Sequence, residues 1–190
     1  MARDIGETLY DVLTGDEAGR ACRDLPDDAC RHRARNFFIH VASLTLTKAG
    51  DGLADARLVL PWLLGAVGAP AAAIGFLVPV REALALLPQL ALSAQVRALP
   101  VRKGVWAAAS VAQGACVLAM AAVVTTLEGA AAGWSVVALL ALFALARSAA
   151  SVSQKDVLAK TVDKRRRGTA TGLAGSLGAA AVLAFGGGFA

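Results

Sequence analysis

The stretch TLTKAGDGLADARLVLPWLL, from Thr45 to Leu64, places four charged residues inside an otherwise apolar segment that begins at Phe37. A charged side chain at the centre of a bilayer costs about 2.5–3.5 kcal/mol on insertion scales, and it is usually paired inside a helical bundle. Such residues often mark a transport or proton pathway. The stretch therefore predicts a membrane-spanning helix whose polar groups have a function.

The composition of the whole chain indicates a polytopic α-helical membrane protein. Of its 190 residues 57% are hydrophobic and 17% are charged, and the mean hydropathy is +0.60. A membrane-spanning helix needs about 20 apolar residues. Five segments qualify, at about residues 37–64, 70–96, 105–127, 132–152 and 169–190. The sequence thus predicts an all-α fold, with a cytoplasmic N-terminal segment at residues 1–36 and a transmembrane domain at residues 37–190.

The distribution of basic residues predicts the orientation of these segments. The pieces before the first segment, between the second and third, and between the fourth and fifth carry 6, 3 and 6 Lys or Arg residues, and the other two connections carry none. By the positive-inside rule the N-terminus lies in the cytoplasm, and we expect a multi-pass protein of the cytoplasmic (inner) membrane. Because topology explains the net charge of +5, we expect the lipid bilayer as a partner and no nucleic acid.

Two short amphipathic helices are expected outside the apolar segments. Ile5, Leu9 and Leu13 recur every four residues, which favours a helix near residues 4–14. Residues 153–167 combine charged positions with an apolar face and end in a basic run, which is typical of a helix at the membrane interface.

No enzyme or metal site is predicted. Cys22, Cys30 and Cys116 are too few and too scattered for a disulfide framework, and their spacing fits no zinc pattern, so we expect reduced thiols. Hydrolase, metalloprotease and nucleotide-binding motifs do not occur. We therefore expect neither catalysis nor a cofactor.

The candidates for a functional site are the charged residues within the apolar segments: Asp51, Lys48, Asp55, Arg81, Glu82 and Arg147. On a continuous helix the side chains of Lys48, Asp51 and Asp55 fall within about 60° of one another. Arg57 would point to the opposite side, where it could extend to the external interface. The first segment therefore predicts one charged face centred on Asp51.

The charges of the second segment lie at a matching depth. By helical rise, Arg81 and Glu82 should be level with Asp51, and the charges of the first two segments sum to zero. This balance favours a neutral polar network, with either a purely structural role or a role in substrate or proton coupling. Arg147 could face the same cavity or extend toward the cytoplasmic interface.

The glycines of the last segment indicate helix packing. Gly172, Gly175 and Gly178 are three residues apart, and Gly168 with Gly172 forms one GxxxG motif. Small residues of this kind let membrane helices approach closely, whereas a nucleotide-binding loop requires a preceding strand.

Several of these features resemble the major facilitator superfamily of transporters. The Gly50–Leu53 stretch resembles the LGDGL sequence of that family's first helix. The short basic loop that ends at Arg102–Lys103 resembles the loop between its helices 2 and 3, although Ala98 and Val101 stand where the family has Asp and Gly. Arg147 and the basic loop at residues 155–167 resemble the region of helices 4 and 5. The resemblance covers about residues 37–190.

The resemblance implies a secondary active transporter that moves a small-molecule or ion substrate by alternating access. The family's fold has twelve spans in two six-helix halves, with the substrate near the midplane between them. Five spans would form an incomplete N-terminal six-helix bundle, so we expect a truncated chain whose missing C-terminal helices are its partners. The alternative is a small five-span membrane scaffold or assembly protein without transport activity, in which the charged residues serve helix association.

Overall fold

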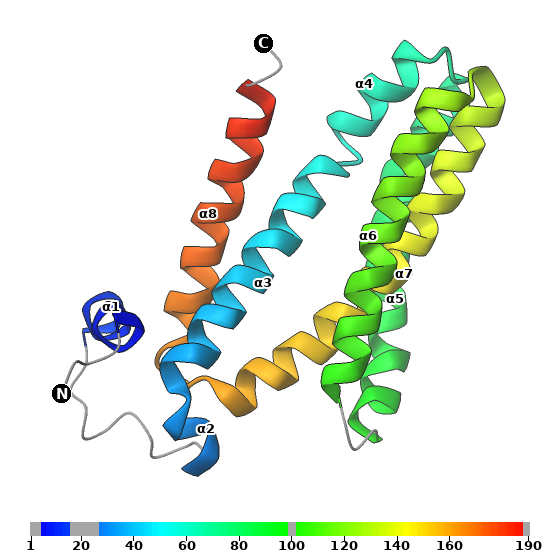
Figure 1. Cartoon of the computed structure of the whole chain (residues 1–190). Coiled ribbons are helices and arrows are strands. Elements are labelled where there is room, and N and C mark those ends of the chain that lie inside the picture. The colour runs from blue at the N-terminus through cyan, green and yellow to red at the C-terminus, as the bar shows by residue number, and fades with distance from the viewer. Residues whose placement is uncertain (1–4, 16–26, 99–101, 188–190) are drawn as a thin grey trace. The chain divides into compact units, whose positions relative to one another are not determined.

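The computed structural model describes residues 5–15, 27–98 and 102–187, and these residues form helices and no strand (Figure 1). The helices of this described part are α1 (Ile5–Thr14), α2 (Asp27–Arg31), α3 (Arg33–Leu53), α4 (Val59–Ala66), α5 (Ala71–Ala98), α6 (Arg102–Thr126), α7 (Gly129–Thr161) and α8 (Arg167–Gly187). The predicted all-α fold class is confirmed. Cys22, residues 99–101 of the predicted basic turn and residues 188–190 lie outside the described residues.

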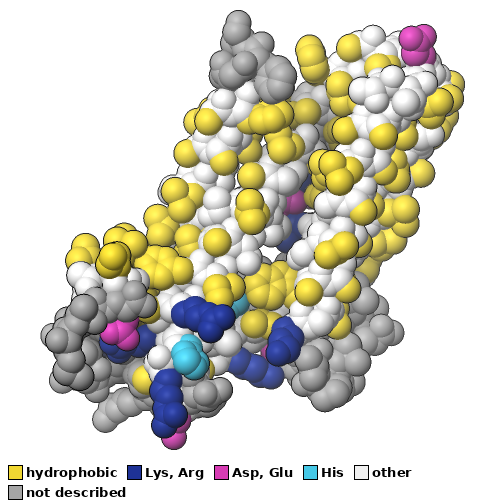
Figure 2. All heavy atoms as spheres, viewed as in Figure 1, with side chains coloured by type: hydrophobic (Ala, Val, Ile, Leu, Met, Phe, Trp, Pro, Cys, Tyr) yellow, Lys and Arg dark blue, Asp and Glu magenta, His cyan; other side chains and the backbone are white. Residues whose placement is uncertain are grey.

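Four helices of the described part are long and apolar enough to cross a membrane, through Ala71–Gln89 of α5, Lys103–Thr126 of α6, Gly129–Thr161 of α7 and Arg167–Gly186 of α8. Protein covers little of their surface: the buried share of residues is 11% in α5 and reaches only 39% in α7. Figure 2 shows hydrophobic side chains spread along the exposed faces of the long helices. Apolar surface of this extent requires lipid around it. The chain is a polytopic α-helical membrane protein.

The first predicted segment, residues 37–64, is not one helix. The helix α3 ends at Leu53, residues 54–58 form turns, and α4 begins at Val59. Asp55 Oδ1 accepts hydrogen bonds from the backbone N–H groups of Arg57 (2.9 Å) and Leu58 (2.8 Å). Aspartate favours such local bonds over a helix interior, and this explains the interruption. The expectation that Asp51, Asp55 and Arg57 share one continuous helix is therefore wrong.

The helices divide into two compact units. Unit 1 comprises Met1–Ala49 and Lys155–Ala190, and unit 2 comprises Gly50–Gln154. The first part of α7 belongs to unit 2 and its end belongs to unit 1. A separate interfacial helix at residues 153–167 was expected, and this expectation is wrong because α7 continues unbroken to Thr161.

Unit 2 has an apolar core between α4, α5, α6 and α7, which includes Leu60, Leu64, Leu77, Met120, Val136, Leu140 and Phe143. The start of α7 lies close to the start of α5, because a Cβ atom at Gly133 would be 3.0 Å from the Cβ atom of Ala73. A larger residue at this position would push the two helices apart. The N–H group of Gly129 also donates to the carbonyl oxygen of Val67 at 2.8 Å. Helices α5 and α7, which carry Arg81, Glu82 and Arg147, are thus held together at one end.

Unit 1 is built around an aromatic pair from α1 and α3. The side chain of Tyr10 is only 4% exposed, and its ring meets the ring of Phe37 edge-on at 5.4 Å. The buried residues Leu158, Val162 and Ala170 belong to the same cluster. The helix expected near residues 4–14 is confirmed as α1. The side of α1 that packs on the rest of unit 1 carries Tyr10, and it is not the side predicted from the spacing of the apolar residues. The spaced residues Ile5, Leu9 and Leu13 are exposed.

In unit 1, α8 approaches α3 at one of the predicted glycines. A Cβ atom at Gly178 would lie 2.7 Å from the Cβ atom of Lys48, so only glycine fits this contact without a shift. Around Gly168 and Gly172 such an atom would meet nothing within 4 Å. The packing role predicted for the glycines of this segment is therefore confirmed at Gly178, and for the GxxxG pair of Gly168 and Gly172 it stays a prediction, since no described residue approaches them closely.

The cysteines differ from the expectation of reduced thiols. Cys30 of α2 is disulfide-bonded, whereas Cys116 of α6 is a free thiol. The separation of two cysteines along the chain does not fix the distance between their Cα atoms, and that distance decides whether they can be bridged. The expectation is wrong for Cys30.

Candidate functional site

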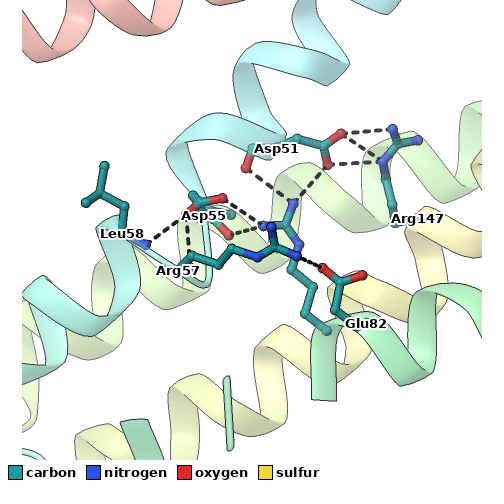
Figure 3. Close-up of polar contacts among 8 residues, drawn as sticks. Asp51, Asp55, Arg57, Leu58, Glu82 and Arg147 are labelled. Atoms are coloured by element: carbon teal, nitrogen blue, oxygen red, sulfur yellow. Dashed lines mark hydrogen bonds and ion pairs between the residues drawn. The ribbon is translucent and has the colours of Figure 1, made fainter. Parts of the chain in front are cut away.

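A cavity of about 370 Å³ in unit 2 brings together most of the charged residues that the sequence singled out. It lies between the end of α3, the turn at residues 54–58, α5 and α7. Its polar lining consists of Asp51, Asp55, Arg57, Arg81, Glu82, Gln89, Arg147 and Ser151. Figure 3 shows the carboxylates and guanidinium groups of the labelled residues pointing toward one another.

Asp51 forms the centre of this cluster through its pair with Arg147. The Nε atom of Arg147 lies 3.0 Å from both carboxylate oxygens of Asp51, and Nη2 lies 2.8 Å from Oδ2. This two-pronged contact is the strongest geometry available to an arginine and a carboxylate. The side chains are 21% and 29% exposed, so solvent screens the pair only partly. Arg147 could either face the cavity or extend toward the cytoplasmic interface, and in the structure it faces the cavity.

Arg81 of α5 lies on the other side of Asp51 and holds the end of α3. Its Nη2 atom is 3.7 Å from Asp51 Oδ1, and its Nη1 atom is 3.6 Å from Asp55 Oδ2. Both nitrogens also donate to carbonyl oxygens, those of Ala54 at 3.2 Å and Asp51 at 3.4 Å. The last carbonyls of a helix have no partner within it and carry partial negative charge. Arg81 therefore stabilises the break after α3 as well as the carboxylates beside it.

Arg57 and Glu82 form an outer pair at the mouth of the same cavity. Arg57 Nη2 donates to Glu82 Oε1 at 2.9 Å, and the two side chains are 71% and 50% exposed. An exposed pair of this kind contributes at most about 1 kcal/mol. The expectation that Arg57 points away from the other charges is wrong, because the turn at residues 54–58 redirects the chain before this residue.

Lys48 is not among the residues that line the cavity. It belongs to unit 1, where its side chain is exposed and runs along α8 beside Gly175 and Gly178. The charged face predicted for the first segment is thus divided, because Asp51 and Asp55 line the cavity and Lys48 does not.

Two uncharged polar residues of the lining were not singled out from the sequence. Gln89 of α5 and Ser151 of α7 both line the cavity. Their spacing in the sequence could have identified them. Gln89 follows Arg81–Glu82 by two helical turns, and Ser151 follows Arg147 by one turn, so each shares a helix side with a charged residue. Polar residues at this spacing form a stripe on one side of an otherwise apolar helix.

The chemistry of the cavity is that of a balanced charge network. Three arginines face three carboxylates, and the arginines keep their charge at any physiological pH, so only the carboxylates can change theirs. No group of three His, Cys, Asp or Glu residues that could hold a metal ion was found in the part of the chain that the structure describes. No protein-family model matches this chain, and no curated protein or solved structure matches it.

Proposed function

We propose that this chain carries the N-terminal spans of a secondary active transporter of the major facilitator type, which moves a small solute or ion across the cytoplasmic membrane. The observation that carries the proposal is the charged cavity of unit 2, in which Asp51 is held between two arginines of apolar helices. Charged residues in such helices are expensive to insert, and where they occur they usually line the path of a substrate or proton.

The interruption between α3 and α4 supports the same proposal. Residues 54–58 leave the helical path beside the cavity, and Asp55 both holds this turn and lines the cavity. Substrate sites of secondary transporters are typically built from helices that are broken near the middle of the membrane. A break that serves only helix association would have no reason to lie at a charged cavity.

The pair of Asp51 and Arg147 provides a contact that can open during transport. It joins the end of α3 to α7, and these residues are 96 positions apart in the sequence. Neutralising Asp51 by a proton removes most of the attraction and frees both elements to move. Alternating access needs such a contact, because a bistable element must be biased by the ligand or proton that it carries.

The orientation belongs to the proposal as well. The positive-inside count supports an N-terminus in the cytoplasm. The disulfide bond of Cys30 argues for the opposite orientation, because disulfides are rare in cytoplasmic proteins. The orientation is therefore tested directly. In a Cys116→Ser background, Glu128→Cys should react with a membrane-impermeant thiol reagent added to intact cells, and Lys160→Cys should react only after permeabilisation. The opposite pattern would reverse the orientation.

The test of transport uses the protein encoded by the complete reading frame that contains this chain, in inverted membrane vesicles. Addition of a transported solute should collapse an imposed pH gradient, read with a pH-sensitive dye. Asp51→Asn should abolish this collapse, whereas Asp156→Asn, at a carboxylate paired with Lys160 on α7, should not. Normal proton-coupled transport by Asp51→Asn at normal abundance would contradict the role of Asp51. A stable protein that moves none of a broad solute panel would favour the membrane scaffold.

A further inference from the structure

We infer that the cavity of unit 2 binds a small monovalent oxyanion, of the carboxylate or sulfonate type, which takes the place of Asp51 on Arg147 while Asp51 accepts one proton. The binding site stands on the geometry of unit 2, and the transport of the anion rests on the proposed function.

The first argument is an asymmetry of charge. At neutral pH the three arginines and three carboxylates of the lining cancel. Arginine does not lose its proton in proteins, whereas a carboxylate can be neutralised. Each protonation therefore moves the cavity from neutral to positive, and no accessible proton change makes it negative. The ligand that restores neutrality in the protonated state is an anion.

The second argument is the geometry around Asp51. Its carboxylate already shows how an oxyanion fits, with both oxygens 3.0 Å from Nε of Arg147 and one of them 2.8 Å from Nη2. The guanidinium of Arg81 lies on the other side, with Nη2 at 3.7 Å from Oδ1. A ligand carboxylate or sulfonate presents two oxygens at the same spacing, and so it can accept the same forked contact.

The remaining groups around Asp51 favour an anion over a cation. The charged groups that face Asp51 are Arg81 from α5 and Arg147 from α7, and α6 contributes no residue to the lining. A cation that displaced Arg147 from Asp51 would leave this guanidinium group half-buried without its acidic partner, which is costly. The remaining carboxylates of the lining, Asp55 and Glu82, already have basic partners.

The exchange is balanced in charge and in atoms. One anion enters, Asp51 leaves Arg147, and one proton from water forms an O–H bond on the Asp51 carboxylate. No other bond changes, and the cavity is neutral before and after. The bound anion raises the affinity of Asp51 for the proton, and the bound proton raises the affinity of the cavity for the anion. By linkage the two factors are equal. A cavity of about 370 Å³ has room for one small molecule of this kind.

The binding experiment uses the full protein in lipid nanodiscs and three probes of similar shape: benzenesulfonate, neutral benzenesulfonamide and cationic benzamidinium. Benzenesulfonate stays ionised at every pH used, so a change of its affinity reports the protein. We expect it to bind about tenfold more tightly at pH 5.5 than at pH 8, a coupling of ordinary size. The other two probes should bind weakly at both values. Preferred binding of benzamidinium would overturn the inference.

Variants assign the effect to the pair. Asp51→Asn mimics the protonated carboxylate, so benzenesulfonate should bind this variant at pH 8 as tightly as it binds the wild-type protein at pH 5.5. Arg147→Gln should weaken its binding at least about tenfold, and Asp156→Asn in unit 1 should match the wild type. Weaker binding to a folded Asp51→Asn protein would contradict the inference. Proton uptake by the wild-type protein on binding benzenesulfonate, read with a pH indicator, needs no variant. A tenfold change in affinity between pH 5.5 and 8 corresponds to an average uptake of about 0.4 proton per bound anion over this range. No uptake at any of these pH values would overturn the inference.

The same probes separate this inference from the proposed function. Benzenesulfonate that binds with a proton, in a protein that moves no solute in proteoliposomes, would leave the anion site standing and contradict the transporter. Proton-coupled movement of solutes without any preference for anions in binding or uptake would leave the transporter standing and contradict the anion site.

Discussion

Each of the two units places a pair of arginines around a single side chain, and the two clusters differ in what that side chain is. In unit 2 the central side chain is the carboxylate of Asp51, with Arg81 at 3.7 Å and Arg147 at 2.8 Å. In unit 1 it is the ring of Tyr10. Coulomb attraction dominates the first cluster, and it disappears when the carboxylate takes up a proton.

The central side chain of the cluster in unit 1 has no such switch, although Arg33 also lies 3.9 Å from the carboxylate of Asp11. The guanidinium carbons of Arg33 and Arg166 lie 5.6 and 5.7 Å from the centroid of the Tyr10 ring, at a distance where a cation is attracted by the ring quadrupole. Arg166 also donates to the carbonyl oxygen of Thr14. An aromatic ring keeps its face at any pH, so the attraction is permanent. The difference suggests that similar arginine pairs serve function in unit 2 and fixation of α1 in unit 1.

The largest expected effect is the loss of the aromatic centre. Tyr10→Ala should lower the free energy that holds α1 on unit 1 by about 3 kcal/mol, because a nearly fully buried ring and its edge-on contact with Phe37 are removed. Amide hydrogen exchange of residues 5–14 should accelerate. Tyr10→Phe keeps the ring and should cost less than about 1 kcal/mol. Unchanged exchange in the alanine variant would show that the ring does not hold α1.

The next effect breaks the charged centre of unit 2. Arg147→Gln should lower stability by about 2 kcal/mol, less than the loss of one partner costs in a fully buried pair, because these side chains are 21% and 29% exposed. Adding Asp51→Asn to this variant should restore part of the loss, since an unpaired carboxylate is then removed. Thermal unfolding in detergent, read by tryptophan fluorescence, supplies the double-mutant cycle. Additive effects of the two substitutions would contradict the direct pair.

The sequence predicted the helices more fully than it predicted the cluster. Long apolar runs determine helices in a bilayer, because every backbone group must be satisfied within the chain, and the segments at α5, α6, α7 and α8 follow from this. The apolar length of residues 37–64 predicts one helix, and this prediction is wrong because Asp55 favours a turn within the run. Asp55 prefers to bond the next N–H groups, and only the structure shows that it does so.

The partners within the cluster depend on tertiary packing. Depth along a helix could bring Arg81 and Asp51 to the same level, but the 96 positions between Asp51 and Arg147 left the side that Arg147 faces undetermined. Helical periodicity put Lys48 on the same face as Asp51 and Asp55, but Lys48 does not line the cavity. The face of an ideal helix does not determine which neighbouring helix it will contact. The glycine that admits Lys48 is in α8.

A smaller effect tests whether Lys48 belongs to unit 1 rather than to the charged cavity. Gly178→Ala should destabilise by about 1 kcal/mol, because its Cβ would lie 2.7 Å from the Cβ atom of Lys48 and α8 would have to shift. Gly172→Ala is the matched control, since nothing lies within 4 Å of its added Cβ, and it should stabilise the helix by about 0.5–1 kcal/mol. Equal responses of the two variants in thermal unfolding would contradict the close approach at Gly178.

The smallest effect concerns the exposed pair of the cavity and sets the scale for the others. Glu82→Gln should change stability by less than about 0.5 kcal/mol, because the side chains of Arg57 and Glu82 are 71% and 50% exposed and water screens their attraction. That small contribution should vanish in 1 M salt, whereas the half-buried pair of Asp51 and Arg147 should keep most of its own. Unfolding temperatures of both variants at low and high salt make the comparison. A Glu82 effect as large as that of Arg147→Gln would mean that the whole ring of charges acts as one unit, and Asp51 would then lose its special position in it.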